Sequence, residues 1–198
     1  MRLITISGLD GSGKTTQLDL IEEKLKNKFQ VKRFHMVTFS IANKILKKKT
    51  FSNQPKAQKK AGFFGIFLRK IAIIIDVFRF RFYYLIKTNE NKIDYIIVDR
   101  YFYDQIINIK YLDLKNSWEN QPFWQTVVEN QLIQPQLKIY LQITPEKILE
   151  RDRKIEQGEE YLINKNSLYD YFSKKWKLTR IDGKENKKEI QQKINRLI

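Results

Sequence analysis

Hydrophobic positions along the chain follow two different periods. Short, nearly continuous apolar runs predict buried strands, and the stretches between them place apolar residues three or four positions apart, which predicts amphipathic helices. The predicted strands are 2–7, 31–39, 94–99, 137–143 and 178–182. The predicted helices are 15–29, 41–48, 66–86, 103–110, 118–132, 160–176 and 187–197, together with one that begins at Thr144 and Pro145. Strands that alternate with helices favour an α/β fold with a parallel sheet.

This alternation runs through all 198 residues without an internal repeat or a linker. A chain of this length buries a sizeable core as one unit. We therefore expect a single domain that spans residues 1–198. Residues 49–65 have the composition of a loop and are expected on the surface.

The chain is strongly basic. Its formal net charge of +16 implies an anionic partner such as a nucleotide, a nucleic acid or an acidic surface. Between residues 43 and 89, twelve lysines and arginines stand against Asp76 alone. This region is either a solvated face or a contact surface. It lacks the regular interleaving of aromatic and basic residues that single-strand binding requires, so nucleic acid is an alternative partner that we do not favour.

The absence of cysteine excludes disulfides, thiolate metal sites and cysteine nucleophiles. No signal peptide precedes the first predicted strand, so a cytoplasmic location is expected. Residues 62–86 form the most apolar long segment, but charged residues interrupt it, and no transmembrane segment is predicted.

Residues 8–15, Gly-Leu-Asp-Gly-Ser-Gly-Lys-Thr, fit the pattern G-x-x-x-x-G-K-[ST] at every fixed position. A predicted strand precedes them and a predicted helix follows, which is the context in which this pattern forms a phosphate-binding P-loop. The glycines let backbone N–H groups surround the phosphates. Lys14 is expected to bring positive charge to the β- and γ-phosphates, and Thr15 to offer a hydroxyl to Mg²⁺.

The predicted strand 94–99 ends in a carboxylate, Asp99, and Arg100 follows at once. In a parallel sheet the carboxyl ends of the strands share one edge with the P-loop, so Asp99 is expected to reach Mg²⁺ directly or through water. Arg100 is expected to point toward the phosphates, with a salt bridge at the strand end as the alternative. His35, the only histidine, is interpreted as structural or exposed.

Three motifs together resemble the thymidylate kinase family. They are Gly8 to Gln17, Asp99-Arg100-Tyr101 and Arg151-Asp152-Arg153, in the order and spacing of that family, and the resemblance covers nearly the whole chain. The first motif is common to P-loop proteins, and its combination with the second points to this family. The resemblance implies a P-loop NTPase fold with a five-stranded parallel sheet flanked by helices, ATP with Mg²⁺ as the phosphoryl donor, and a nucleoside monophosphate acceptor.

The resemblance also implies roles for individual residues. The catalytic candidates are Lys14, Asp99, Arg100 and Arg153. The metal candidates are Thr15 and Asp99. The nucleotide-binding candidates are Gly8, Asp10, Gly11, Ser12, Gly13, Lys14, Thr15, Thr16 and Arg151. The candidates for binding the acceptor are Asp10, Arg79, Arg100 and Tyr103.

A small lid is expected at about residues 151–162. Ser12 occupies a P-loop position where some members of the family place a catalytic arginine. The chain resembles the subgroup that supplies this charge from the lid, so Arg153 is expected to act as an arginine finger in cis.

Three positions depart from the family's usual pattern. Ile75 stands where a phenylalanine commonly stacks on thymine, residues 37–40 lack the usual arginine, and Asp104 replaces a usual serine. The machinery for phosphoryl transfer is intact, but the part of the site that reads the base is altered.

The sequence thus predicts ATP-dependent phosphorylation of a nucleoside monophosphate, with dTMP as the favoured acceptor. One alternative is a P-loop kinase of another phosphorylated or hydroxylated acceptor, including nucleic-acid 5′ ends. The other is a non-catalytic nucleotide-binding accessory protein. The long apolar helix at 66–86 is a candidate face for a homodimer.

Overall fold

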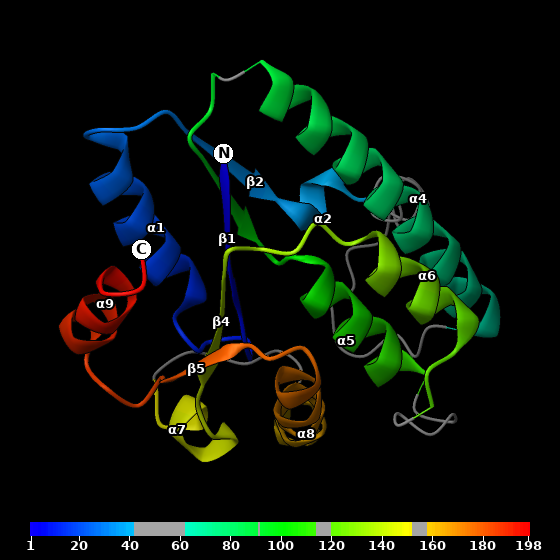
Figure 1. Ribbon diagram of the computed structural model, residues 1–198. Helices are drawn as coiled ribbons and strands as arrows, with labels where there is room; N and C mark the ends of the chain where they lie inside the picture. Colours follow the sequence, from blue (N-terminus) through cyan, green and yellow to red (C-terminus); the bar gives the residue numbers. More distant parts are fainter. Residues whose placement is uncertain (42–61, 91, 114–119, 152–157) are drawn as a thin grey trace, which may run out of the picture.

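The computed structural model describes residues 1–41, 62–90, 92–113, 120–151 and 158–198. Within these ranges five parallel strands form one sheet in the order β2-β3-β1-β4-β5, shown in Figure 1. The strands are β1 (Arg2–Ser7), β2 (Val31–His35), β3 (Tyr95–Asp99), β4 (Leu137–Gln142) and β5 (Thr179–Asp182). The expected α/β fold with a five-stranded parallel sheet is confirmed.

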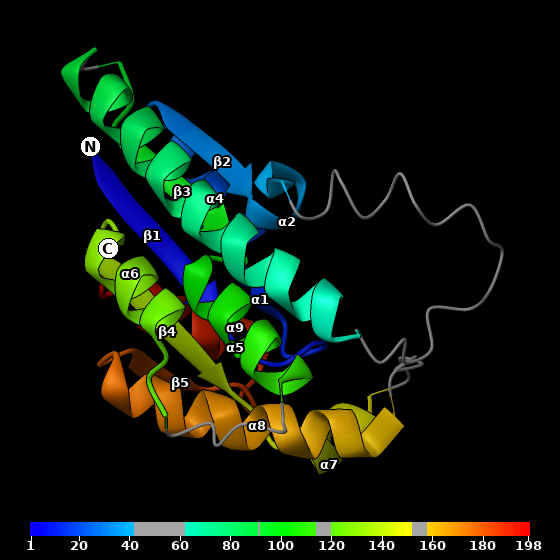
Figure 2. The same ribbon diagram turned by 90° about the vertical axis from the view of Figure 1, so that its right-hand side faces the viewer.

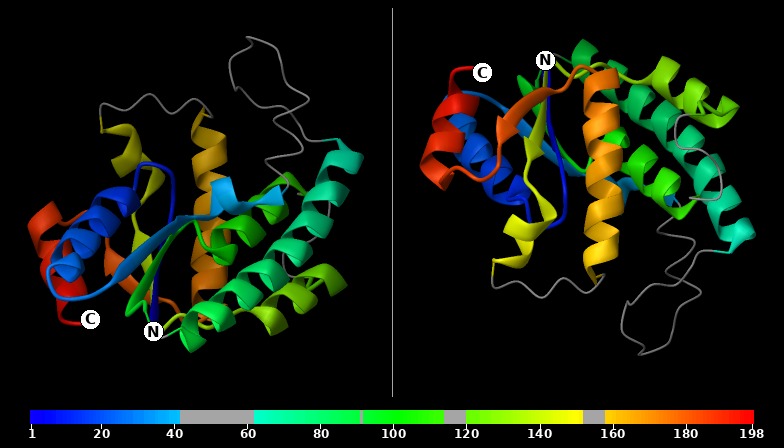
Figure 3. Two further views of the ribbon diagram at one scale, coloured as in Figure 1. Left: turned by 90° about the horizontal axis from the view of Figure 1, so that it is seen from above. Right: turned by 90° about the horizontal axis from the view of Figure 1, so that it is seen from below.

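Helices cover both faces of the sheet. The described helices are α1 (Lys14–Lys26), α2 (Met36–Phe39), α4 (Phe63–Asn89), α5 (Phe102–Leu112), α6 (Phe123–Gln131), α7 (Pro145–Leu149), α8 (Gly158–Lys175) and α9 (Lys187–Asn195). Seen from above in Figure 3, α1 and α9 lie on one face, and α4, α5, α6 and α8 lie on the other. Figure 2 shows that α4 runs along the outside of this second layer, where it packs on α5 and α6.

The two layers follow from the alternation of side chains along each strand, which sends successive residues to opposite faces. Ile4 and Ile6 of β1 face α1 and α9 and join one apolar core. Leu3 of the same strand faces the other way and joins a second, larger core with α4, α5, α6 and α8. The nearly continuous apolar runs in the central strands are therefore explained by burial on both faces.

The parallel register places the predicted motifs at one edge of the sheet. Ile6 of β1 pairs with Asp99 of β3, so the P-loop, which follows β1, begins next to the end of β3. His35, the last residue of β2, also pairs with Asp99. Three carboxyl ends of strands therefore meet beside the P-loop, as the sequence predicted.

The expected strand 31–39 is too long. It ends at His35, where its partner β3 also ends, and Met36 to Phe39 turn into the short helix α2. The Thr38 hydroxyl donates a hydrogen bond to the His35 carbonyl at 2.8 Å and stabilises this turn.

Other expected boundaries shift. The loop expected to end at residue 65 gives way to α4 at Phe63, and Pro122 precedes the start of α6 at Phe123. Thr144 occupies the N-cap position of α7 but its side chain makes no capping hydrogen bond. Three expected segments lie wholly or partly outside the described residues: most of the helix 41–48, residues 49–61 of the loop 49–65, and Trp118 and Glu119 of the helix 118–132. Among the helices in the described ranges, none is both long and apolar enough to cross a membrane.

Candidate active site

The backbone of the P-loop requires its glycines. Gly8 has φ of +150°, and a Cβ there would lie 2.7 Å from the Leu141 carbonyl oxygen of β4, which is too close for any side chain. Gly13 has φ of +97° at the N-cap of α1, where the left-handed conformation favours glycine. The loop thus packs against the sheet while it leads directly into the N-terminus of a helix, where the dipole favours an anion.

Lys14, the first residue of α1, is buried at the base of this loop. Its ammonium donates a hydrogen bond to the Leu9 carbonyl at 2.5 Å. Burial, together with the nearby Arg100 cation, lowers the pKa of Lys14 to about 8. The lysine is therefore protonated at pH 7 and places one positive charge inside the P-loop.

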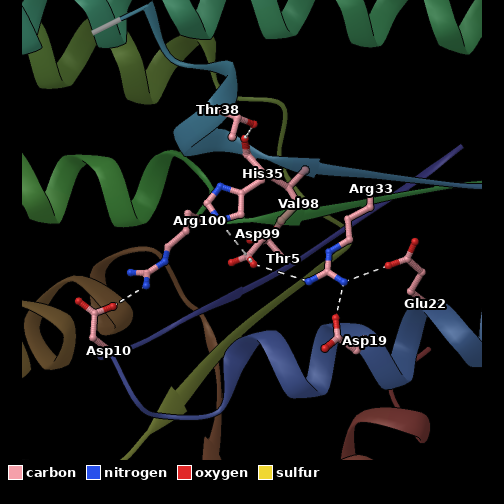
Figure 4. Close-up of polar contacts among 10 residues, drawn as sticks. All are labelled: Thr5, Asp10, Asp19, Glu22, Arg33, His35, Thr38, Val98, Asp99 and Arg100. Carbon is pink, nitrogen blue, oxygen red and sulfur yellow. Dashed lines mark hydrogen bonds and ion pairs between the residues drawn. The ribbon is translucent and has the colours of Figure 1, made fainter. Parts of the chain in front are cut away.

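Arg100 and Asp10 form an ion pair between the end of β3 and the P-loop, shown in Figure 4. The Arg100 Nη2 atom lies 2.5 Å from Asp10 Oδ1. Arg100 has φ of +63°, a left-handed conformation that is uncommon for a non-glycine residue and costs free energy. Burial alone would raise the pKa of Asp10, but the cations of Arg100, Lys165 and Lys14 hold it well below its usual value. The aspartate is therefore a permanent anion.

Asp99 is buried at the end of β3, and Figure 4 shows it between two basic side chains of β2. Its Oδ2 atom lies 3.6 Å from Arg33 Nη2 and 4.0 Å from His35 Nε2. Arg33 also pairs with Asp19 and Glu22 of α1. The only histidine is thus half-exposed beside a site residue, and the Arg33 contact is one that the sequence did not predict.

The site has buried polar atoms whose hydrogen-bonding capacity is unused in the described part of the chain. They are Asp99 Oδ1 and Ser12 Oγ. Thr15 and Thr16 are exposed in the first turn of α1. No cluster of three or more potential metal ligands occurs in the described ranges. This sparse set of oxygen donors fits Mg²⁺, which is usually held by one or two protein oxygens together with substrate phosphates and waters.

A second polar network, which the sequence did not reveal, lies behind the P-loop. Its first part surrounds Asp104 of α5, which accepts hydrogen bonds from Ser7 Oγ at 2.9 Å and from the Tyr169 hydroxyl of α8 at 2.7 Å. Burial raises the pKa of Asp104 above its usual value. The aspartate at this unusual position is therefore a buried, fully bonded group.

The second part of this network surrounds Lys165 of α8. Its ammonium donates hydrogen bonds to the Tyr161 hydroxyl at 2.7 Å and to Asn108 Oδ1. The Tyr161 hydroxyl in turn donates to Asp10 Oδ2 at 2.7 Å. Burial lowers the pKa of Lys165 to about 8, so this side chain is also protonated at pH 7. A signal for Lys165 existed, since a lysine stands on the otherwise apolar face of a predicted helix.

Arg151 lies where the lid was expected and contacts the P-loop. Its guanidinium donates hydrogen bonds to the Gly11 carbonyl at 3.0 Å and to the Gly183 carbonyl at 2.8 Å. Of the expected lid at 151–162, residues 152–157, including Arg153, lie outside the described residues, and Gly158 to Leu162 form the first turns of α8.

Two of the acceptor-binding candidates do not join this cluster. Arg79 of α4 pairs with the buried Asp76 at 2.7 Å and lies over the Phe39 ring, 4.5 Å from its centroid. Tyr103 is only 1% exposed, and its hydroxyl donates to Gln134 Oε1. The structure places Tyr103 in the core instead of the site, and its neighbour Asp104 points to the P-loop strand.

A cavity of about 750 Å³ lies at the opposite end of the sheet. It is lined by Met1, Arg2, Lys24, Leu25, Asn27, Lys28, Phe29, Asp94, Tyr95 and Ile198. These residues lie at the amino ends of β1 and β3 and at the end of α1 that is far from the P-loop. Ligands of parallel sheets bind at the carboxyl ends of the strands, so we place the candidate active site at the P-loop.

Comparisons with known proteins agree with this geometry. The family model described as thymidylate kinase matches residues 6–194. A probable thymidylate kinase from Methanosphaera stadtmanae is 27% identical over 201 residues, which cover 98% of this chain and 96% of that protein. The structure of thymidylate kinase from Candida albicans has the same fold, with a TM-score of 0.66 at 17% identity, and the match covers 100% of this chain and 90% of the other. Because the family model spans nearly the whole chain, this protein belongs to the thymidylate kinase family of nucleoside monophosphate kinases.

Proposed function

We propose that this protein transfers the terminal phosphoryl group of ATP to dTMP, which yields ADP and dTDP. The observation that carries the proposal is the position of the Arg100–Asp10 ion pair, which joins the P-loop to the end of β3 beside Lys14. A P-loop binds the donor phosphates, and an arginine next to it can bind the phosphate of an acceptor. Family membership supports both assignments.

The donor side consists of the P-loop and Arg151. The backbone from Gly8 to Gly13 and the side chains of Lys14, Thr15 and Thr16 are proposed to bind the phosphates of ATP. Thr15 and Asp99 are proposed to hold Mg²⁺, which supplies neutralisation of the charge on the β- and γ-phosphates. Arg151 keeps the loop in place through the Gly11 carbonyl.

The acceptor side consists of Arg100, Asp10 and Arg79. Arg100 presents a fork of N–H donors that suits a phosphate. Asp10, held as an anion, is proposed to accept a hydrogen bond from the sugar of the acceptor. Arg79, which pairs with Asp76 outside this cluster, is proposed to contribute a second cation from α4. In-line transfer requires little covalent chemistry from the protein, so these groups act by positioning the two substrates and neutralising charge.

The proposed location of the protein is the cytoplasm.

An acceptor panel tests this proposal. Wild-type protein is incubated with Mg·ATP and dTMP, dUMP, other nucleoside monophosphates or an oligonucleotide with a 5′-hydroxyl group. We expect dTMP to be phosphorylated, with a modest preference over dUMP, because Ile75 replaces an aromatic partner and stacking contributes about 1–3 kcal/mol per base. Phosphorylation of the oligonucleotide in preference to every monophosphate would contradict the proposal.

We also propose that α4 forms the face of a homodimer. Apolar side chains line its exposed surface. They include Phe67, Ile71, Phe78, Phe82, Leu85 and Ile86. Contiguous apolar surface of this kind favours association, and a two-fold dimer would bury the same stripe on both copies.

Phe78→Glu is expected to convert the dimer to a monomer, because it places a charge in the middle of this apolar stripe. The measurement is molar mass by light scattering after gel filtration. Ile163→Glu on α8 is the matched control, since Phe78 and Ile163 are both 47% exposed. The control should keep the mass of the wild type. A monomeric wild type, or an unchanged mass in Phe78→Glu, would exclude α4 as the interface.

A further inference from the structure

We propose that Lys165 is a positioning residue for the acceptor side of the active site, and that it acts by fixing the direction of the Tyr161 hydroxyl toward Asp10. This inference rests on the proposed function. It assigns a role to a lysine on α8 that belongs to none of the sequence motifs.

The contacts form a continuous chain from α8 to the end of β3. Lys165 Nζ donates to the Tyr161 hydroxyl at 2.7 Å, and this hydroxyl donates to Asp10 Oδ2 at 2.7 Å. Arg100 Nη2 donates to the other oxygen, Asp10 Oδ1, at 2.5 Å. Asp10 is thus held from two sides, by Tyr161 and by Arg100. The orientation of Arg100 therefore depends on Asp10, and the orientation of Asp10 depends on Tyr161 and Lys165.

The chemistry of the ammonium group explains why a lysine serves at this position. An ammonium only donates hydrogen bonds, so the Tyr161 oxygen must accept from it and must direct its own hydrogen elsewhere. Asp10, a permanent anion, is the acceptor that this hydrogen reaches. A second hydrogen of the ammonium binds Asn108 Oδ1 on α5, the helix that follows Arg100 and Tyr101. Lys165 thereby connects α8 to α5 as well as to the P-loop.

Packing alone does not explain why a lysine occupies this buried position on α8. Its side chain is 2% exposed, and within the described residues its ammonium donates to two neutral oxygens and to no carboxylate. Burial of the ammonium costs folding free energy, which the nearby Asp10 and Asp104 carboxylates offset only in part. Replacement of Lys165 by methionine removes that cost but leaves Asn108 Oδ1 without its donor, so we expect only a small change in the melting temperature, whereas the donor that orients Tyr161 is lost.

The test compares Lys165→Met with the wild type in steady-state kinetics. We expect kcat/KM for dTMP to fall by about 10²-fold, the size of effect that follows a small misplacement of a positioning group. KM for ATP should stay within about threefold of the wild type, because the chain of contacts ends on the acceptor side. Lys165→Arg, which keeps a donor-only cation, should recover part of the loss. Lys174→Met, on an exposed position of the same helix, is the control and should match the wild type.

A double-mutant cycle tests whether Lys165 acts through Tyr161. If Lys165 acts through Tyr161, Lys165→Met combined with Tyr161→Phe should lose no more activity toward dTMP than the more damaging of the two single variants. Multiplicative losses would overturn the proposal. Equal increases in both KM values together with a lowered melting temperature would also overturn it, since they indicate a structural role.

The result also separates this inference from the function on which it rests. A wild type that phosphorylates dTMP, with Lys165→Met within about threefold of it, would overturn only the role of Lys165. A wild type that does not phosphorylate dTMP at all would overturn the proposed function and this inference with it.

Discussion

Replacement of Lys14 by alanine is expected to lower kcat for phosphoryl transfer by about 10³-fold or more and to leave the fold intact. The lysine brings a buried positive charge to the place where negative charge spreads over the transferred group, and pre-oriented charges of this kind supply much of enzymatic rate enhancement. The fold should survive because the loop conformation is fixed by its glycines and by contact with β4. The measurements are ADP release with dTMP as acceptor and the melting temperature.

Lys24→Ala provides the matched control for this experiment. Lys24 lies on the same helix, α1, but it is exposed and far from the P-loop. Its replacement should leave kcat unchanged. Activity of Lys14→Ala within a few fold of the wild type would remove the P-loop from the mechanism.

Arg153→Ala is expected to lower kcat by about 10³-fold with little change in the affinity for ATP, as for other arginine fingers. The reason lies in the P-loop, where Ser12 stands at a position that carries an arginine in some members of the family. Arg153 lies outside the described residues, so this expectation comes from the sequence. Steady-state kinetics and calorimetric binding of ATP measure the two quantities separately.

Arg151→Ala should behave differently, and it serves as the comparison. Arg151 binds the carbonyl oxygens of Gly11 and Gly183, so it supports the P-loop in the ground state and the transition state alike. Its loss should raise KM for ATP several-fold and leave kcat nearly unchanged. An unchanged kcat in Arg153→Ala would show that Lys14 and Arg100 neutralise the charge on the transferred group.

Much of the fold was predictable because its signals are local. The P-loop glycines, the apolar strands and the carboxylate at the end of β3 all lie in short continuous stretches, and parallel topology alone brings them to one edge. Strand and helix ends were less predictable. The end of β2 depends on where β3 ends, and α2 begins at Met36 because no ladder partner follows His35.

The rest of the site depends on contacts that sequence patterns do not encode. Tyr161 reaches Asp10 from a helix 151 positions later in the chain, and that contact exists only because α8 packs against α5 behind the P-loop. The directions in which the side chains of α5 point were also not predictable from the sequence. Tyr103 and Asp104 are neighbours, and the register of the helix sends the tyrosine into the core and the aspartate to Ser7 and Tyr169.

This chain is proposed to move a phosphoryl group from ATP to dTMP through its P-loop. The most direct measurement follows the label from [γ-³²P]ATP in the presence of Mg²⁺ and dTMP, with the products separated by chromatography and with Lys14→Ala as the blank. We expect labelled dTDP in amounts equal to the ADP formed, well above the blank. Labelled dTDP no greater than in Lys14→Ala, or ATP hydrolysis to free phosphate without dTDP, would contradict it.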